Sequence, residues 1–576
     1  MRPAARLSTF VLALAVIAFP GTASAEHGNA DDASPNMFHV ANLPPPPQFL
    51  VGPPNETRVN SDLAFHGAGK TRSRHHDLLA QGNYDGFRLV DISDPSNPVE
   101  VAVVECRANQ GDLSFYEAKD RLLLIQSIEI AQTTSDCATA RDQPIAPGIH
   151  PITGLPGNFF VPGFEGLRIF DVTNPEAPVH IASVPTACGS HTHTTIRDQR
   201  NQQGVVYVSS YPTGASVTPG NAEFGGPRCV PPHAKISIVI IPDDSPATPI
   251  VKEHPLHADT LPFRGTLASG GTGAQACHDI TAYYETQSAN PNQNFQSPNP
   301  KFHVAGAACL EEGQLWDITD PANPTTLGAH SHIRNPFISA QNGLFHTASF
   351  SNDGEVVLFT DEFAGGGGSG CKGPEDTRGN VWFHKNVPPG TEPVPVYGRY
   401  MIPRPQPQPE ICSLHNGNVI TTSDEADGDF GVSSMYQGGT TVFDFTGIGQ
   451  LEERVLPPSL PAPAPPLVAR EVAYFDAKND PPPPTGIDDV WSTYWYNDFI
   501  YASSGRVQAG RPGNRGLDVY MLVGKNGRLV DRGTGLPTVT TRQDANRPNV
   551  QQFKGRKVRY MNPQTQDTFH SVSHGQ

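Results

Sequence analysis

The sequence predicts an all-β protein, namely a single β-propeller of seven blades, each with four antiparallel strands, and long loop insertions. Three observations predict this fold. Proline (58) and glycine (55) are abundant while charged residues make up only 17% of the chain. No long apolar stretch has the 3.6-residue period of a helix. A short strand-like motif recurs along the chain, and many short strands joined by Gly/Pro-rich turns are typical of sandwiches, barrels and propellers.

The recurring motif is a short apolar strand, an Asp, a Ser or Thr two residues later, and Pro at the fourth and seventh positions after the Asp. Its three clear copies are Gly86-FRLV-Asp91-ISD-Pro95-SN-Pro98, Gly166-LRIF-Asp171-VTN-Pro175-EA-Pro178 and Gln314-LW-Asp317-ITD-Pro321-AN-Pro324. The Asp and the Ser/Thr can bond to nearby backbone and form a turn. Each Pro then ends the strand. A fourth copy, Gly439-TTVF-Asp444-FT, keeps the strand and the Asp but lacks the prolines.

Seven segments are predicted to begin the innermost strand of a blade. They start at Asp62, Asp112, His191, His278, His346, His415 and Trp491. Insertions at 138–160, 285–300, 363–380 and 456–468 are predicted to be surface loops. The propeller is therefore expected to span 59–525, between an extended N-terminal segment, 26–58, and a polar C-terminal tail, 526–576.

Residues 1–25 have the features of an export signal. Arg2 and Arg6 form a short basic region, an apolar core follows, and Ala23-Ser24-Ala25 is a small-residue cleavage pattern. The apolar core is too short to span a bilayer and no later stretch is apolar enough to do so. We expect a secreted or otherwise extracytoplasmic protein, cleaved near Ala25.

Eight cysteines in an exported chain predict disulfide bonds. Sequential pairing closes loops of similar size, although eight cysteines allow 105 connectivities. The expected pairs are Cys106 with Cys137, Cys188 with Cys229, Cys277 with Cys309, and Cys371 with Cys412.

The net charge of −17 comes without a basic stripe. A nucleic-acid partner is therefore not expected.

Several segments resemble one known family. They are Asp62-LAF, Gln81-GNYDGFRLVDISDP, Cys188-GSHTHT, Cys412-SLHNGNVI, Tyr436-QGGTTVFDFT, Trp491-STYWYND and Gly516-LDVY. In this order they are similar to bacterial exported proteins with the LVIVD repeat. The resemblance implies a β-propeller fold and export, and very little chemistry.

Histidine marks four of the seven predicted inner-strand starts. The candidate metal ligands are His191, His193, His278, His346 and His415. Because the first strand of each blade lines the axis, residues at one level of different blades converge there. Converging imidazoles suit zinc, copper or iron. The alternative is that these histidines bond to neighbouring backbone and line a polar, water-filled channel.

Two carboxylates and one aromatic residue lie near these histidines in sequence. Glu362 and Glu425 are candidate partners for the second ring nitrogen of a metal-bound histidine. Trp491 is expected to close the mouth of the channel. Cysteines also precede the histidines, but in an exported protein a disulfide is favoured over thiolate ligation.

Two functions follow from these observations. The first is a binding or scaffold module that takes a protein, peptide, glycan or small molecule on its loop face or in its channel. The second is a metalloprotein, for example an oxidoreductase, in which the inner-strand histidines hold one copper, iron or zinc ion. The sequence assigns neither a substrate nor an enzyme class.

Overall fold

The structure of the chain is a computed structural model. It describes residues 32–50, 58–67, 77–108, 110–132, 134–137, 148–149, 156–157, 163–211, 229, 233–256, 276–284, 303–324, 331–339, 341, 343–366, 373, 375–388, 390–391, 393–404, 406, 412–422, 428–477, 490–504, 506–507, 515–530, 538, 550–555, 560–561 and 565–567. The signal segment 1–25 lies outside these residues, so its cleavage stays a prediction.

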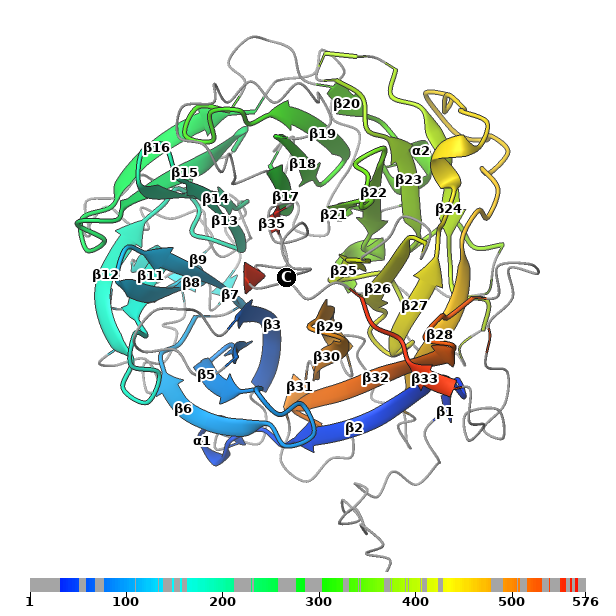
Figure 1. Cartoon of the computed structure of the whole chain (residues 1–576). Helices are drawn as coiled ribbons and strands as arrows, with labels where there is room; N and C mark the ends of the chain where they lie inside the picture. Colours follow the sequence, from blue (N-terminus) through cyan, green and yellow to red (C-terminus); the bar gives the residue numbers. More distant parts are fainter. Residues whose placement is uncertain are drawn as a thin grey trace, which may run out of the picture.

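The predicted seven-bladed propeller is confirmed, and Figure 1 shows the blades arranged around one axis. Blade 1 contains β3 (Arg58–His66), β4 (Leu78–Asn83), β5 (Gly86–Asp91) and β6 (Val99–Glu105). Blade 2 contains β7 (Gln110–Ala118), β8 (Arg121–Gln132), β11 (Phe164–Asp171) and β12 (Val179–Pro185). Blade 3 contains β13 (Thr192–Asp198), β14 (Gln203–Ser209), β15 (Lys235–Pro242) and β16 (Ile250–Pro255).

The remaining blades follow the same order from the axis outwards. Blade 4 contains β17 (Asp279–Tyr284), β18 (Val304–Cys309), β19 (Glu312–Asp317) and β20 (Ser331–Ile333). Blade 5 contains β21 (Phe345–Phe350), β22 (Val356–Asp361), β23 (Val381–Lys385) and β24 (Val396–Tyr400). Blade 6 contains β25 (Gly417–Ile420), β26 (Phe430–Ser434), β27 (Thr440–Asp444) and β28 (Arg470–Asp476).

Blade 7 is closed by the N-terminal segment. Its inner strands are β29 (Val490–Tyr496), β30 (Phe499–Ser504) and β32 (Leu517–Lys525), and its outermost strand is β2 (Met37–Leu43). The short β1 (Asp32–Ala33) extends blade 6 by pairing with β28. Part of the segment that the sequence sets apart from the propeller is therefore integral to it, because β2 joins the two ends of the ring.

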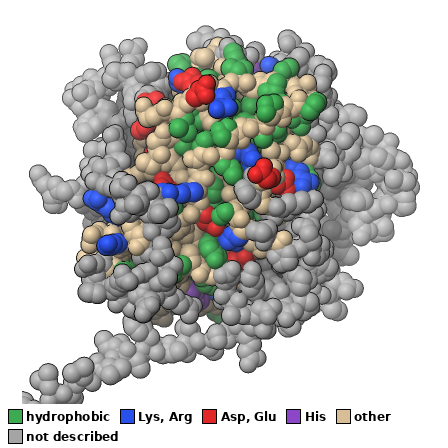
Figure 2. All heavy atoms as spheres, turned by 90° about the vertical axis from the view of Figure 1, so that its right-hand side faces the viewer, with side chains coloured by type: hydrophobic (Ala, Val, Ile, Leu, Met, Phe, Trp, Pro, Cys, Tyr) green, Lys and Arg blue, Asp and Glu red, His purple; other side chains and the backbone are tan. Residues whose placement is uncertain are grey.

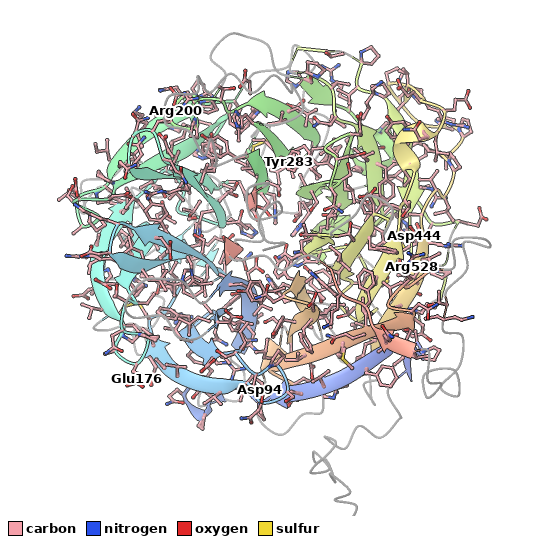
Figure 3. All side chains as sticks on the ribbon, in the orientation of Figure 1. Asp94, Glu176, Arg200, Tyr283, Asp444 and Arg528 are labelled. Carbon is pink, nitrogen blue, oxygen red and sulfur yellow. A yellow bond between two sulfur atoms is a disulfide. The ribbon has the colours of Figure 1, made fainter. Side chains whose placement is uncertain are left out.

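The repeated Asp forms the same turn in four blades. Oδ1 of the Asp accepts a hydrogen bond from the backbone N–H two residues later, at 2.8–3.0 Å, as the sequence predicts. The acceptors are Asp91, Asp171, Asp317 and Asp444. Each Asp ends the third strand of its blade. In Figure 3 the motif residues Asp94 and Glu176 lie at the rim of the propeller, whereas Tyr283 of β17 lies nearer the centre.

Apolar clusters fill all seven interfaces between neighbouring blades. Aromatic pairs join several of them. Phe65 of blade 1 stacks on Tyr496 of blade 7 with ring centroids 4.8 Å apart. Tyr400 of blade 5 stacks on Phe443 of blade 6 at 4.4 Å. Since both faces of each sheet are covered by a neighbour, the blade strands are mainly buried.

Few described segments lie outside the blades. The helices α1 (Pro47–Leu50) and α2 (Pro336–Ser339) and the 3-10 turns Phe363–Gly366 and Ile448–Gln450 are short. The remaining strands are β9 (Gly148–Ile149), β10 (Pro156–Gly157), β31 (Arg506–Val507), β33 (Val550–Gln552), β34 (Tyr560–Met561) and β35 (Thr565–Asp567). The end of the Pro-rich loop 456–468 lies along β24, where Arg399 exchanges backbone hydrogen bonds with Pro466 and Val468. This loop therefore covers the edge of blade 5.

The surface carries charges of both signs. Figure 2 shows acidic and basic side chains interspersed with apolar ones on the side that faces right in Figure 1. Lys385 pairs with Glu453, and Arg470 with Asp444. In the described part of the chain, no helix has the length and apolar character needed to cross a membrane.

Candidate metal site

Four histidines stand at one level of four consecutive blades. His191, His278 and His415 directly precede or closely precede β13, β17 and β25, and His346 is the second residue of β21. The repeated backbone geometry places them there. The N–H groups of His191, His278 and His415 each donate to a carbonyl at or next to the end of the second strand in their own blade, namely Ser209, Ala308 and Ser434, at 2.7–3.0 Å.

The four imidazoles form a continuous row. The ring centroids of His191 and His278 are 4.2 Å apart, those of His278 and His346 are 4.0 Å apart, and those of His346 and His415 are 4.2 Å apart. Trp491 of blade 7 continues the row, with its ring 4.8 Å from His415. The row therefore covers blades 3 to 7, with Trp491 packed beside His415. That Trp491 closes the mouth of the channel stays a prediction.

The next residue of each inner strand forms a second polar layer. The Thr347 hydroxyl lies 3.4 Å from both Asp279 Oδ2 and Asn416 Oδ1, and Asn416 Nδ2 donates to Asp62 Oδ2 at 3.1 Å. Burial, followed by the neighbouring Asp112 charge, raises the pKa of Asp62 to about 8. For the same two reasons the pKa of Asp279 is well above its ordinary value. These bonds tie the inner strands together at one depth beneath the histidines.

Two ring nitrogens in the row are buried and lack a hydrogen-bond partner among the described residues. They are Nδ1 of His278 and Nε2 of His346. The other nitrogen of His346 contacts the Thr347 hydroxyl at 2.7 Å. His415 is held differently, because its Nδ1 donates to the carbonyl of Trp491 at 2.5 Å and thereby leaves Nε2 as the acceptor.

Glu362 places a carboxylate against these nitrogens. Its Oε2 is 3.9 Å from His346 Nε2 and its Oε1 is 3.8 Å from His415 Nε2. One potential ligand atom from each of His278, His346 and Glu362 lies within 4.8 Å of the other two. The Tyr436 hydroxyl also donates to Oε1 of Glu362. The sequence indicates Glu362 as a hydrogen-bond partner behind a ligand, whereas this geometry groups its carboxylate with the potential ligand atoms of His278 and His346.

Burial keeps His278, His346 and His415 neutral at pH 7. It lowers the pKa of His415 to about 3 and those of His278 and His346 well below the ordinary value. Burial also raises the pKa of Glu362 to about 7, although the Tyr436 hydrogen bond acts against this. A metal binds neutral imidazole and ionised carboxylate, so the imidazoles already have the protonation state that ligation needs.

His191 has a more polar environment than the other three. Its Nδ1 is 2.7 Å from Glu129 Oε1 and its Nε2 is 2.8 Å from Gln110 Nε2. The Tyr211 hydroxyl lies 3.0 Å from Nδ1. Both nitrogens of His191 therefore already have polar partners.

His193 lies outside the row. Its Nε2 is 2.7 Å from the Ser114 hydroxyl and its Nδ1 is 2.8 Å from the Ser127 hydroxyl. Its backbone N–H donates to Asp112. The structure thus places His193 between blades 2 and 3, bonded on both ring nitrogens. Glu425 lies outside the described residues.

Disulfides hold the chain just before three of the histidines. The structure confirms the pairs Cys106–Cys137, Cys188–Cys229 and Cys277–Cys309. Cys412 is also disulfide-bonded, and its expected partner Cys371 lies outside the described residues. These bonds are consistent with an extracytoplasmic protein. They also leave Cys188, Cys277 and Cys412 unavailable as thiolate ligands.

Four residues that contact the row were not predicted. Gln110 and Glu129 belong to β7 and β8, Tyr211 follows β14, and Tyr436 precedes β27. Tyr436 stands three residues before the fourth repeat copy at Gly439, and this was the only local sign of its position.

Comparison with known proteins identifies the repeat. The family model for the LVIVD repeat matches residues 80–105, which contain β5 and β6. No curated protein sequence matches the chain.

Solved structures resemble this chain at low identity. A Lactobacillus plantarum protein has 10% identity and a TM-score of 0.40, covering 84% of this chain and 96% of its own. The β-propeller domain of Cps50 (Swd1) from Myceliophthora thermophila has 9% identity and a TM-score of 0.36, covering 81% and 99%. The periplasmic gluconolactonase PpgL of Pseudomonas aeruginosa has 12% identity and a TM-score of 0.34, covering 70% and 85%. None of them bears on the chemistry of this chain, which is a β-propeller that carries the LVIVD repeat.

Proposed function

We propose that this protein is an exported metalloprotein that holds one transition-metal ion on the propeller axis. The ligands are His278, His346 and His415, with Glu362 as the carboxylate ligand. His191 is the nearest neighbour of this set and not part of it, since Glu129 and Gln110 occupy its ring nitrogens. His193 is left out because two serine hydroxyls bind it.

The observation that carries the proposal is the pair of buried, unpartnered ring nitrogens on His278 and His346. Leaving one buried polar group without a partner costs about 1–3 kcal/mol. A metal ion between them supplies both nitrogens with a partner at once. It also offsets the cost of keeping Glu362 ionised in a buried site.

The distances suit such a site after a small contraction. Ligand atoms around an ion at about 2.1 Å lie within roughly 4.2 Å of one another. The corresponding atoms of His278, His346 and Glu362 lie within 4.8 Å. For these three residues, binding therefore requires side-chain movements of less than about 1 Å. His415 Nε2 lies 3.8 Å from Glu362 Oε1, next to this group.

The donor set selects the class of metal. Three imidazole nitrogens and one carboxylate oxygen favour zinc, iron or copper. Calcium and magnesium prefer oxygen ligands, so they are not expected at this position.

Metal content tests the proposal. The protein is purified without an affinity tag, and its metals are measured before and after titration with Zn²⁺, Cu²⁺ or Fe²⁺. We expect about one equivalent of one of these ions, lost in the His278→Ala/His346→Ala variant. His332→Gln serves as the control, because His332 is bonded to Glu312 in the outer part of blade 4.

Less than about a tenth of an equivalent, unchanged in the double variant, contradicts the proposal. That result favours the other function predicted from the sequence, a binding or scaffold module for a protein, peptide, glycan or small molecule.

A further inference from the structure

The chain returns to the propeller axis after completing blade 7. β33 pairs antiparallel with the end of β32, and Val550 lies opposite Lys525. Phe553 then packs between blades 6 and 7, where it is 2% exposed. Its ring lies 5.6 Å from that of Phe430 and 5.7 Å from that of Trp495. This part of the segment is therefore anchored in the core between two blades.

The next two strands pair with inner strands on opposite sides of the ring. β34 pairs antiparallel with the end of β3, with Tyr560 opposite His66. β35 pairs parallel with the end of β17, with Gln566 opposite Tyr283. Blades 1 and 4 are as far apart as two blades of seven can be, and β34 and β35 contact each other. Figure 1 shows β35 beside β17 near the centre. The two contacting strands β34 and β35 therefore connect inner strands on opposite sides of the axis.

This crossing lies at the end of the inner strands remote from the histidines. On β17 the paired residues begin at Ala282, four residues after His278. On β3 they are Phe65 and His66, three and four residues after Asp62. Asp62 and Asp279 belong to the single polar layer beneath the histidines. At about 3.3 Å per strand residue, the crossing is about 13 Å deeper than the histidine row.

We propose that β34 and β35 together form an internal plug that closes the far end of the propeller channel. Propeller blades surround a central channel with two ends. With one end closed by β34 and β35, solutes reach the axis from the histidine end alone. The consequence for access to the ion rests on the proposed metal site, whereas the position of the plug does not.

The accessibility of His66 tests the plug without reference to a metal. His66 is 2% exposed and lies on the stretch of β3 that β34 covers. Modification of histidines by diethyl pyrocarbonate is followed by mass spectrometry in a variant that ends at Gly555. We expect His66 to be modified at least about tenfold faster than in the full chain. Backbone amides of β17 from Ala282 to Tyr284 are expected to lose hydrogen-exchange protection.

A variant that ends at Asp567 is the matched control, because it keeps both strands and loses only residues 568–576. It should behave like the full chain. His332, far from the axis, reports on general unfolding and should react equally in all variants. If the shorter variant does not fold, the full-length Tyr560→Pro/Gln566→Pro variant breaks the same pairings. Equal modification of His66 and equal exchange of β17 in all folded variants overturns the plug.

The rate at which EDTA removes the ion tests whether the plug limits access to it. We expect removal to be at least about fivefold faster once the plug is absent, with unchanged metal stoichiometry. Equal rates, together with an exposed His66, overturn the claim that the plug limits access to the ion. If the protein binds no metal, the proposed function fails while the His66 measurement still decides whether the plug exists.

Discussion

The hydroxyl of Tyr436 donates a hydrogen bond to Oε1 of Glu362, the carboxylate that faces His346 and His415. Residues that hold a metal ligand typically contribute 10–100-fold to affinity. Tyr436→Phe is therefore expected to weaken metal binding by at least about tenfold, measured by competition with a chelator.

Tyr501→Phe is the matched control, since Tyr501 is another buried tyrosine but lies in the cluster between blades 1 and 7. Its metal affinity should equal that of the unchanged protein. A Tyr436→Phe protein that binds the ion as tightly as the control shows that Tyr436 does not position Glu362.

Asp518 holds the closing strand β2 against blade 7. It is 2.7 Å from His39 Nε2 and accepts hydrogen bonds from Asn42 and Arg515. Breaking a buried ion pair costs about 3–5 kcal/mol, so Asp518→Asn should lower the free energy of unfolding by about 3 kcal/mol in chemical denaturation. A loss below about 1 kcal/mol in the same assay means that the pairing of β2 with β32 does not depend on the charge of Asp518.

The contacts of Asp518 between β32 and β2 also predict a loss of stability in acid. Burial alone raises the pKa of Asp518, but Arg515 and His39 outweigh burial and hold it well below the ordinary 3.8. The folded state therefore binds the proton of Asp518 more weakly than the unfolded state does. The contribution of Asp518 to the free energy of unfolding is thus complete above pH 3.8 and falls as the pH drops further. The stability difference between the unchanged protein and Asp518→Asn should shrink below about pH 4. A difference that is constant from pH 6 to pH 3 would contradict this assignment.

Gly86 begins the third strand of blade 1 in a conformation that fits glycine. Its φ is +154°, and a Cβ there would lie 2.0 Å from the carbonyl oxygen of Val104. Gly86→Ala should therefore lower the free energy of unfolding by about 2–3 kcal/mol, through backbone strain and overpacking. Gly447→Ala separates the two causes, because Gly447 has φ +76° and nothing within 4 Å of its Cβ. Thermal unfolding should show a smaller loss for Gly447→Ala, and equal losses would rule out the clash.

Two disulfides of nearly equal loop length separate stability from ligand placement. Cys277–Cys309 spans 32 residues and Cys106–Cys137 spans 31. Replacing either pair by serines should cost about 3–4 kcal/mol of stability. Only loss of the Cys277 bond should also weaken metal binding, because Cys277 directly precedes His278. Equal metal affinity in the two variants indicates that the bond is not needed to place His278.

Features that depend on local chemistry were predictable from the sequence. The Asp turns at Asp91 and Asp171 follow from residues two positions apart, and the inner-strand histidines recur at one point of the blade pattern. Their convergence follows from the propeller symmetry, which makes equivalent positions meet on the axis.

Features that depend on contacts between distant segments were not predictable. Glu129 reaches His191 across 62 residues, and Tyr436 reaches Glu362 across 74. The sequence indicates both His191 and His193 as candidate ligands, and the structure gives them different partners because His193 meets serines of the neighbouring blade. The pairing of β2 with β32 joins residues nearly 480 positions apart. No local pattern marks such a partner.

The most direct measurement is anomalous diffraction from crystals of the protein titrated with its metal. We expect one peak about 2.0–2.2 Å from ring nitrogens of His278, His346 and His415 and from a carboxylate oxygen of Glu362. A metal peak elsewhere, or no peak and water-bonded imidazoles along the row, would contradict the proposed metal site.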